Sequence, residues 1–255
     1  MKIGFFDSGI GGVTVLKEAI KMYPNAHYIY FADTDNVPYG TRKKKEIKAL
    51  VDDAVDFLVN EMKIDLLVIA CNTATSVCIK DLRARLIIPV VGMEPAIKPA
   101  SLATRNKKSR KRILVSATRI TLKQKKLKDL INDLNASDKV DLISLQKLVK
   151  FSERKEINSA KVIKYLKKKL SNYDLNKYGA FVLGCTHFVY YRDLIESLLP
   201  SHIKLIDGNN GTVNRMIYLI RKTKLPQCSS QVSYYASKRK LPFRKLNAYL
   251  DLVEL

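Results

Sequence analysis

The alternation of short apolar runs with amphipathic stretches constrains the fold of this 255-residue chain more than any other feature. Continuous apolar segments at 3–6, 66–70 and 180–184 have the length and composition of buried strands. Longer segments between them have helical spacing. Between Ile47 and Leu58, for example, apolar side chains recur every three or four residues. Strands that alternate with helices in this way predict an α/β protein with mostly parallel sheets.

The same reading extends along the whole chain. We expect strands at 3–6, 28–31, 66–70, 89–91, 113–116, 140–144, 180–184 and 203–206. We expect helices at 13–22, 47–58, 73–85, 122–134, 158–170, 193–199 and 212–220, and a strand plus a short helix in the tail, 231–255. Pro and Gly predict a turn at 37–40, and two prolines followed by a basic cluster predict a domain crossing within 95–112.

Two segments of the chain resemble each other. Residues 66–73 read LLVIACNT and residues 180–187 read AFVLGCTH. Each has an apolar run, a small residue, a cysteine and then polar residues, where a strand turns into a helix. We therefore infer two similar halves whose strands end at one cleft, because ligands in open α/β sheets bind beyond the carboxyl ends of the strands.

The chain is strongly basic, with a formal net charge of +22, of which residues 101–150 contribute +10. Such a charge fits a nucleic-acid partner. The basic runs 43–45, 107–112 and 167–169 nevertheless lack interleaved aromatic residues, and no zinc-finger or aromatic RNA-binding signature is present. We expect a solvated lysine-rich surface that attracts an anionic substrate, with nucleic-acid binding at most a secondary role.

Composition also bears on location. No apolar stretch approaches the ~18–20 residues that span a bilayer, and the first residues lack a secretory pattern. Four scattered cysteines without a C-x-x-C motif indicate free thiols in a reducing compartment. We therefore expect a cytoplasmic protein with no membrane partner.

The glycine-rich segment DSGIGG, residues 7–12, lies between the first strand and the first helix. Its glycines let backbone N–H groups face a ligand, and a helix start favours anions. A dinucleotide site is one alternative, with Asp33 as the ribose-binding acid. The spacing GxGG in place of GxGxxG, and the negative charge of Asp7 beside a pyrophosphate, argue against it. A simple tight turn is the other alternative.

Two of the four cysteines, Cys71 and Cys185, are candidates for chemistry. A thiol acts as a base only as the thiolate, and a helix N-terminus lowers its pKa. Each is followed by hydrogen-bonding residues, Asn72-Thr73 or Thr186-His187, and His187 can tune the nearby thiol or shuttle a proton. A buried structural cysteine is the alternative, and we expect that role for Cys78 and Cys228.

Three kinds of site compete for these thiols. A metal site is not expected, because the cysteines lack local pairing and His27 and His202 have apolar surroundings. A hydrolase with Cys185 as nucleophile and His187 as base needs only one thiol. Two equivalent bases at one cleft suit removal of a proton from one face of a carbon and its return on the other, which is racemisation or epimerisation.

At this point the chain resembles the glutamate racemase family of cofactor-independent aspartate/glutamate racemases. The resemblance runs the whole length and depends on six motifs in order: FDSGIGG at 6–12, VPYG at 37–40, ACNTA at 70–74, GMEPA at 92–96, AT at 117–118 with Thr121, and GCTH at 184–187. The chain departs from the family at Val189 and Lys150, where the family has Pro, and at Gly208-Asn209.

The resemblance implies two pseudo-symmetric three-layer α/β/α domains, residues 1–96 plus 207–255 and residues 97–206, with the active site between them. It implies a two-base mechanism without pyridoxal phosphate or another cofactor. Cys71 would take the α-proton from D-glutamate with support from Asp7, and Cys185 would take it from L-glutamate with support from His187 and Glu153.

It further implies a set of residues that hold the substrate: Asp7, Ser8, Pro38, Tyr39, Gly40, Asn72, Thr73, Thr118, Thr121, Thr186 and His187. The expected partners are L- and D-glutamate and a second copy of the chain, since family members are often dimers. The expected role is to supply D-glutamate for peptidoglycan synthesis. Aspartate racemase is the alternative within the family, because substrate length depends on the shape of the pocket.

Overall fold

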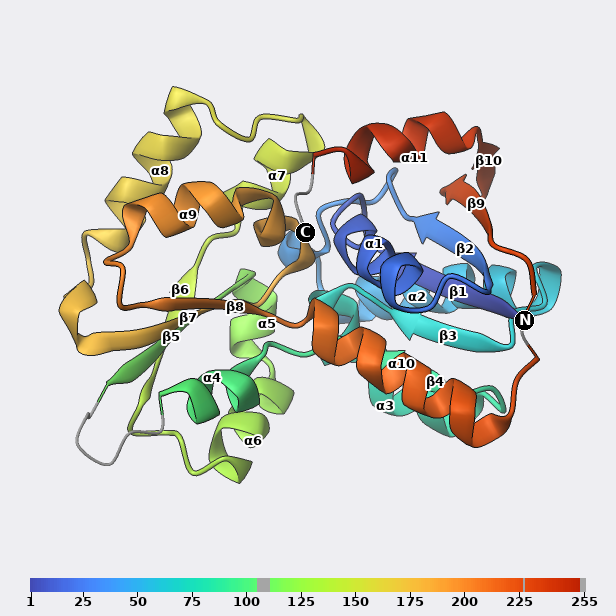
Figure 1. Ribbon diagram of the computed structural model, residues 1–255, viewed down its shortest axis with the longest axis horizontal. Coiled ribbons are helices and arrows are strands. Elements are labelled where there is room, and N and C mark those ends of the chain that lie inside the picture. The colour runs from blue at the N-terminus through green and yellow to red at the C-terminus, as the bar shows by residue number, and fades with distance from the viewer. Residues whose placement is uncertain (105–110, 227, 253–255) are drawn as a thin grey trace.

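The computed structural model describes residues 1–104, 111–226 and 228–252, which form two sheets side by side (Figure 1). One sheet has six strands in the order β10-β9-β2-β1-β3-β4, and the other has four in the order β6-β5-β7-β8. The strands of the first are β1 (Lys2–Asp7), β2 (His27–Ala32), β3 (Leu66–Ile69), β4 (Val90–Gly92), β9 (Gln231–Ala236) and β10 (Arg239–Leu241). Those of the second are β5 (Arg112–Ala117), β6 (Val140–Ser144), β7 (Tyr178–Leu183) and β8 (Lys204–Asp207).

The two sheets share one order of strands. In the six-stranded sheet the run β2-β1-β3-β4 corresponds to β6-β5-β7-β8 in the other. Every neighbouring pair is parallel except β9 with β10. The predicted α/β class, the mostly parallel sheets and the pseudo-symmetry are therefore confirmed. Below, each sheet with its helices is called the six-stranded half or the four-stranded half.

Helices cover both faces of the six-stranded sheet. Neighbouring side chains of β1 point to opposite faces, so Phe5 joins the core under α1 (Val13–Met22), α10 (Asn209–Thr223) and α11 (Phe243–Leu250). Phe6 joins the core under α2 (Lys44–Asp56) and α3 (Asn72–Arg85). Because both residues are fully buried, this sheet is the middle of three layers.

The four-stranded half repeats this arrangement. On β5, Leu114 packs toward α7 (Lys147–Glu153), α8 (Ala160–Leu170) and α9 (Arg192–Leu198). Its neighbour Val115 packs toward α4 (Ile97–Ala103) and α6 (Lys125–Asp133). The predicted three-layer α/β/α architecture is present in both halves.

Most expected elements are confirmed, and the differences have local causes. The expected helix 122–134 is two helices, α5 (Arg119–Lys123) and α6, because Gln124 adopts an extended conformation between them. Helix α4 was not predicted because Pro99 argued for a crossing. Pro99 lies in the first turn of α4, where a missing N–H costs no intrahelical hydrogen bond. Helix α7 was not predicted either, and the tail holds two strands and a helix.

The three basic runs differ in what the structure shows of them. Residues 43–45 are exposed and residues 167–169 are exposed or half-buried, as a solvated surface requires. Most of the run 107–112, and with it part of the expected crossing, lies outside the described residues. The sheet to which each strand belongs supports the division into 1–96 plus 207–255 and 97–206, which stays a prediction. In the described part of the chain, no helix has the length and apolar character needed to cross a membrane.

Candidate active site

Asp7 is the last residue of β1 and is completely buried. Its Oδ1 accepts a hydrogen bond from the Gly9 backbone N–H at 2.9 Å, and its Oδ2 accepts one from Thr186 Oγ1 of the other half at 3.2 Å. Burial raises the pKa of Asp7 to about 6, although His187 and the hydrogen bond from Gly9 act in the opposite direction. A carboxyl with this pKa can gain or lose a proton near neutral pH.

Two glycines of the 7–12 segment, Gly9 and Gly11, are needed because the four-stranded half approaches so closely. A Cβ on Gly9 would overlap the carboxylate of Glu153, and one on Gly11 would overlap the side chains of His187 and Thr186. The Ile10 N–H donates to Glu153 Oε1 at 3.0 Å. At Ile10 the backbone N–H thus faces a carboxylate of the protein itself, and ligand binding by this segment stays a prediction.

Cys71 is the N-cap residue of α3, as its place after a strand predicted. The Ala74 N–H donates to Cys71 Sγ at 3.5 Å, and Ser8 Oγ lies 3.6 Å from the same sulfur. Burial nevertheless raises the pKa of Cys71 to about 12, with a further contribution from Asp7. The hydrogen bonds lower the pKa by less than burial raises it. The expected net lowering at a helix N-terminus is therefore wrong for this thiol.

Cys185 follows β7, the strand that corresponds to β3. A six-residue 3₁₀ helix, Thr186–Tyr191, begins directly after it, and α9 begins only at Arg192. Cys185 Sγ lies 3.9 Å from His187 Nδ1, and His187 Nε2 lies 2.7 Å from Glu153 Oε1. Burial lowers the pKa of His187, but the hydrogen bonds with Cys185 and Glu153 outweigh it and place the pKa well above its ordinary value. The imidazole therefore carries its positive charge between the Cys185 sulfur and the Glu153 carboxylate.

The two thiols belong to one site. The negative charge that Cys185 can carry is among the influences that raise the pKa of Cys71, so the two sulfurs interact across the junction of the halves. Both are nearly buried, at 5% exposure for Cys71 and 6% for Cys185. The fold thus brings together Asp7, Ser8, Cys71, Glu153, Cys185, Thr186 and His187.

Three threonine hydroxyls form a second cluster at the same junction. Thr73 Oγ1 lies 3.0 Å from Thr118 Oγ1 and 3.3 Å from Thr121 Oγ1, and the last two hydroxyls are 2.9 Å apart. Asn72 beside them donates from Nδ2 to the Met93 carbonyl at 3.4 Å, and its buried Oδ1 has no hydrogen-bond partner in the described part of the chain. This hydroxyl cluster offers neutral donors and acceptors without a charge.

The predicted turn at 37–40 contributes to the same region. Tyr39 is buried and donates its hydroxyl to Asp33 Oδ2 at 2.6 Å, so Asp33 holds the turn in place. Pro38 precedes Tyr39, with a cis peptide bond between Val37 and Pro38. The α-carbon of Gly40 lies close to the side chains of Thr118 and Gln146.

Gln146 was missed at the sequence level. It lies in the loop between β6 and α7, where a polar residue follows a predicted strand, the same signal that identified Asp7 and Thr118. That signal was weak here because Leu145 separates Gln146 from the end of the strand.

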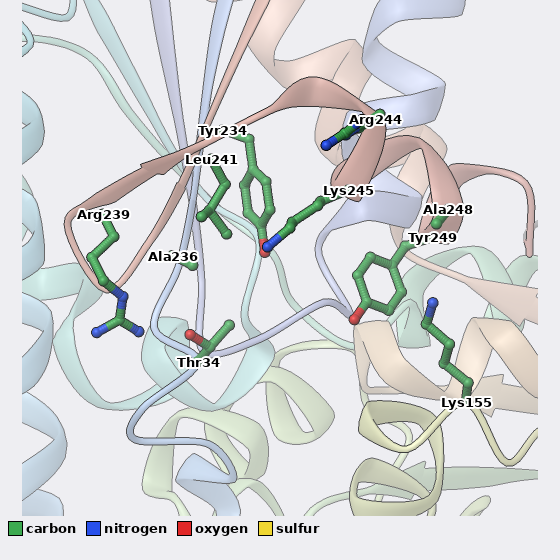
Figure 2. A pocket seen from close by; sticks show the side chains of 10 residues that line it. All are labelled: Thr34, Lys155, Tyr234, Ala236, Arg239, Leu241, Arg244, Lys245, Ala248 and Tyr249. Carbon is green, nitrogen blue, oxygen red and sulfur yellow. The ribbon is translucent and has the colours of Figure 1, made fainter.

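A pocket lies elsewhere in the molecule. It has a volume of about 690 Å³ and is bounded by the β9–β10 hairpin, α11 and Lys155 (Figure 2). None of the residues that line it belongs to the thiol site, although Lys155 follows Glu153 by two positions. Among the described residues, no group of three or more His, Cys, Asp or Glu side chains is arranged to hold a metal ion.

Comparison with known proteins identifies the family. The model of the Asp/Glu/Hydantoin racemase family matches residues 13–216. The chain belongs to this family. Glutamate racemase of Halothermothrix orenii is 46% identical over 257 residues, covering 100% of this chain and 99% of that protein. Glutamate racemase 2 of Bacillus subtilis is 44% identical, covering 100% and 96%.

Solved structures agree. Escherichia coli glutamate racemase, in complex with L-glutamate and the activator UDP-MurNAc-ala, superposes with a TM-score of 0.83 at 27% identity, covering 97% of this chain and 94% of that chain. Glutamate racemase from Campylobacter jejuni gives a TM-score of 0.81 at 28% identity, covering 100% of both chains. As a member of the racemase family, the chain is an enzyme of the isomerase class.

Proposed function

We propose that this racemase interconverts L- and D-glutamate by proton transfer at the α-carbon between two cysteines. The observation that carries the proposal is the pair of buried thiols, Cys71 and Cys185, which follow corresponding strands of the two halves and interact electrostatically. The names of the similar proteins support glutamate as the substrate, and one of them was solved with L-glutamate bound.

The reaction is balanced without a further reactant. One thiolate takes the α-proton and becomes a thiol, and the electrons of the C–H bond stay on the substrate as a carbanion. The second thiol then donates its proton to the opposite face of that carbon and becomes a thiolate. The enzyme ends with the same number of protons but with the roles of the two sulfurs exchanged.

The surroundings of the thiols indicate how each direction begins. The His187 imidazolium lies 3.9 Å from the sulfur of Cys185, the residue that we assign to take the proton of L-glutamate. With its pKa raised to about 12, Cys71 retains its proton and can donate it to the other face. In the reverse direction Cys71 must first lose this proton, and Asp7 is the ionisable carboxyl beside it.

Glu153 acts through His187. Its Oε1 binds His187 Nε2 and the Ile10 N–H at once, so it fixes the imidazole against the 7–12 segment. We propose that Glu153 is a positioning residue, which keeps the ring charged and its Nδ1 directed at Cys185.

The carbanion must be stabilised by fixed donors, because the α-proton is only weakly acidic. Hydroxyls, amides and backbone N–H groups can bind two substrate carboxylates without adding a competing base. We assign this role to Ser8, Pro38, Tyr39, Gly40, Asn72, Thr73, Thr118, Thr121 and Thr186, with Asp7 and His187 at the reacting end.

The product D-glutamate would supply peptidoglycan synthesis in the cytoplasm, and the enzyme would act as a homodimer. Depletion of the enzyme in its own cells should then stop growth, and added D-glutamate should restore it. Sedimentation of the purified protein tests the dimer.

The test of the activity is solvent exchange at the α-carbon, followed by NMR with L-glutamate in heavy water and no added cofactor. We expect the α-proton signal to disappear while D-glutamate forms. Exchange with another amino acid and not with glutamate would retain the mechanism and change the substrate. No exchange with any amino acid would overturn the proposal.

A further inference from the structure

Gln146 is a buried amide that the proposed mechanism does not use. It lies in the loop between β6 and α7, and only 9% of the residue is exposed. Its Oε1 accepts a hydrogen bond from the Arg119 N–H at 3.3 Å. Its Nε2 is fully buried and has no hydrogen-bond partner among the described residues. A buried donor without an acceptor is unfavourable, so this amide is arranged for a group that is not part of the polypeptide.

The amide lies against the proposed substrate residues. A Cβ built on Gly40 would meet both atoms of the amide, with Nε2 at 2.9 Å, and would also meet Thr118 Cβ at 2.8 Å. The Gln146 amide therefore occupies the space that a side chain at position 40 would need. Thr118 in turn binds the hydroxyls of Thr73 and Thr121. The free Nε2–H groups are thus next to the hydroxyl cluster.

This position identifies the part of the substrate that Gln146 would meet. The α-carbon must lie between the sulfurs of Cys71 and Cys185 if they exchange its proton. Gln146 instead accepts from the Arg119 N–H and packs against Gly40, which Thr118 of the hydroxyl cluster also approaches. A group bound there is at the other end of a dicarboxylic amino acid, which is its side-chain carboxylate.

We propose that Gln146 donates from Nε2 to the side-chain carboxylate of the substrate and so sets the preference for a dicarboxylic amino acid. This rests on the proposed racemase function. A neutral amide suits the position, because it binds a carboxylate and supplies no base to compete with the thiols. Since the side-chain carboxylate does not change charge during the reaction, the contact should affect KM more than kcat.

The discriminating variant is Gln146→Glu. It keeps an oxygen for the Arg119 N–H and replaces the donor with a negatively charged oxygen of the same size. We expect KM for L-glutamate to rise about 10- to 100-fold with little change in kcat. L-Glutamine can donate to the new carboxylate, so the ratio of kcat/KM for glutamate to that for glutamine, measured by α-proton exchange, should fall at least as much. Lower pH should restore glutamate binding as the new carboxyl is protonated.

Two further variants complete the test. Gln146→Met removes both polar atoms and should weaken glutamate binding without the pH dependence. Gln231→Glu makes the same change of charge at an exposed residue, the first of β9, and should leave the ratio unchanged. Thermal unfolding verifies that each variant is folded.

The possible failures are distinguishable. If the wild type exchanges glutamate and Gln146→Glu leaves the ratio unchanged, or lowers both substrates equally, the inference about Gln146 is overturned and the proposed function stands. If the wild type exchanges no glutamate, the proposed function fails. Calorimetric binding of glutarate then decides about Gln146, with weaker binding by Gln146→Glu expected and equal binding contradicting it.

Discussion

The two cysteines occupy corresponding positions in the two halves, yet their surroundings are opposite in charge. Cys71 caps the 14-residue helix α3 and has the carboxyl of Asp7 as its ionisable neighbour. Cys185 precedes only a short 3₁₀ helix and has the imidazole of His187 3.9 Å away. The first environment raises the pKa of the Cys71 thiol, and the second places a positively charged imidazole beside the Cys185 sulfur. Pseudo-symmetry of the fold therefore places two thiols at corresponding positions, while local residues give them neighbours of opposite charge.

Each thiol site also depends on the opposite half. Asp7 of the six-stranded half accepts a hydrogen bond from Thr186, the residue after Cys185. His187 is bound through Glu153 to the Ile10 N–H of the segment that begins with Asp7. The charge on His187 lowers the pKa of Asp7 in return. The protonation states of the two sites are thus coupled, and separate changes to each site should have different consequences.

The largest effect is expected from removing either sulfur. Cys71→Ser and Cys185→Ser should each lower racemisation by about 10³-fold or more, because a serine hydroxyl is a far weaker acid than a thiol. Cys71→Ser should still exchange the α-proton of L-glutamate, and Cys185→Ser that of D-glutamate. NMR in heavy water with each enantiomer measures both quantities.

Cys78→Ser is the matched control. Cys78 is also buried in α3, and burial raises its pKa to about 12, but it is not in the site. It should retain most of the activity. A near wild-type rate in either of the other two variants would contradict the two-base assignment.

The next effect comes from the neighbours of the sulfurs. Because two mirror-image substrates have equal free energy, any variant must lower kcat/KM equally in both directions, so only exchange can separate the two sites. Asp7→Asn should slow exchange of D-glutamate by about 10²-fold and that of L-glutamate less. His187→Asn should show the reverse preference. The same preference in both variants would mean that the neighbours do not serve separate thiols.

Asp7 should also reduce stability at neutral pH. Its pKa is about 6 in the folded protein against 3.8 ordinarily, so the folded state binds this proton more tightly. The free energy of unfolding of the wild type therefore falls by about 3 kcal/mol in total as the pH rises from 3.8 to about 6. Asp7→Asn carries no charge there. The variant should be more stable than the wild type by up to about 3 kcal/mol at pH values above about 6. Below pH 3.8 the two proteins should have equal stability. Urea unfolding on either side of this pH range measures the difference, and equal stability at both would contradict the raised pKa.

The sequence predicted the difference between the two thiol sites only in part. Asp7, Cys71 and Cys185 were identifiable because each is a polar or reactive residue directly after an expected buried strand. The effect of burial on the Cys71 pKa could not be predicted from the sequence, because it depends on what surrounds the sulfur in three dimensions. Glu153 was implied by family resemblance alone, because it ends a short helix, α7, that periodicity did not reveal.

The reason for the glycines could not be predicted either. The segment 7–12 suggested a ligand-binding loop, whereas Gly9 and Gly11 accommodate side chains more than 140 positions away, such as Glu153 against Gly9. Long-range approach of this kind leaves no local pattern in the sequence.

The smallest effects are expected from two glycine substitutions that test the close contact between the two halves. A Cβ on Gly11 would overlap His187 and Thr186, so Gly11→Ala must push the halves apart, at a cost of about 1–3 kcal/mol in the free energy of unfolding. Gly211 lies in α10 with no atom within 4 Å of the added Cβ, so Gly211→Ala should stabilise the protein by about 0.5 kcal/mol. Urea unfolding gives both values. Since the displaced His187 can no longer keep its distance to Cys185, Gly11→Ala should also lose exchange of L-glutamate more than that of D-glutamate, and equal losses would show that the two thiol sites move as one.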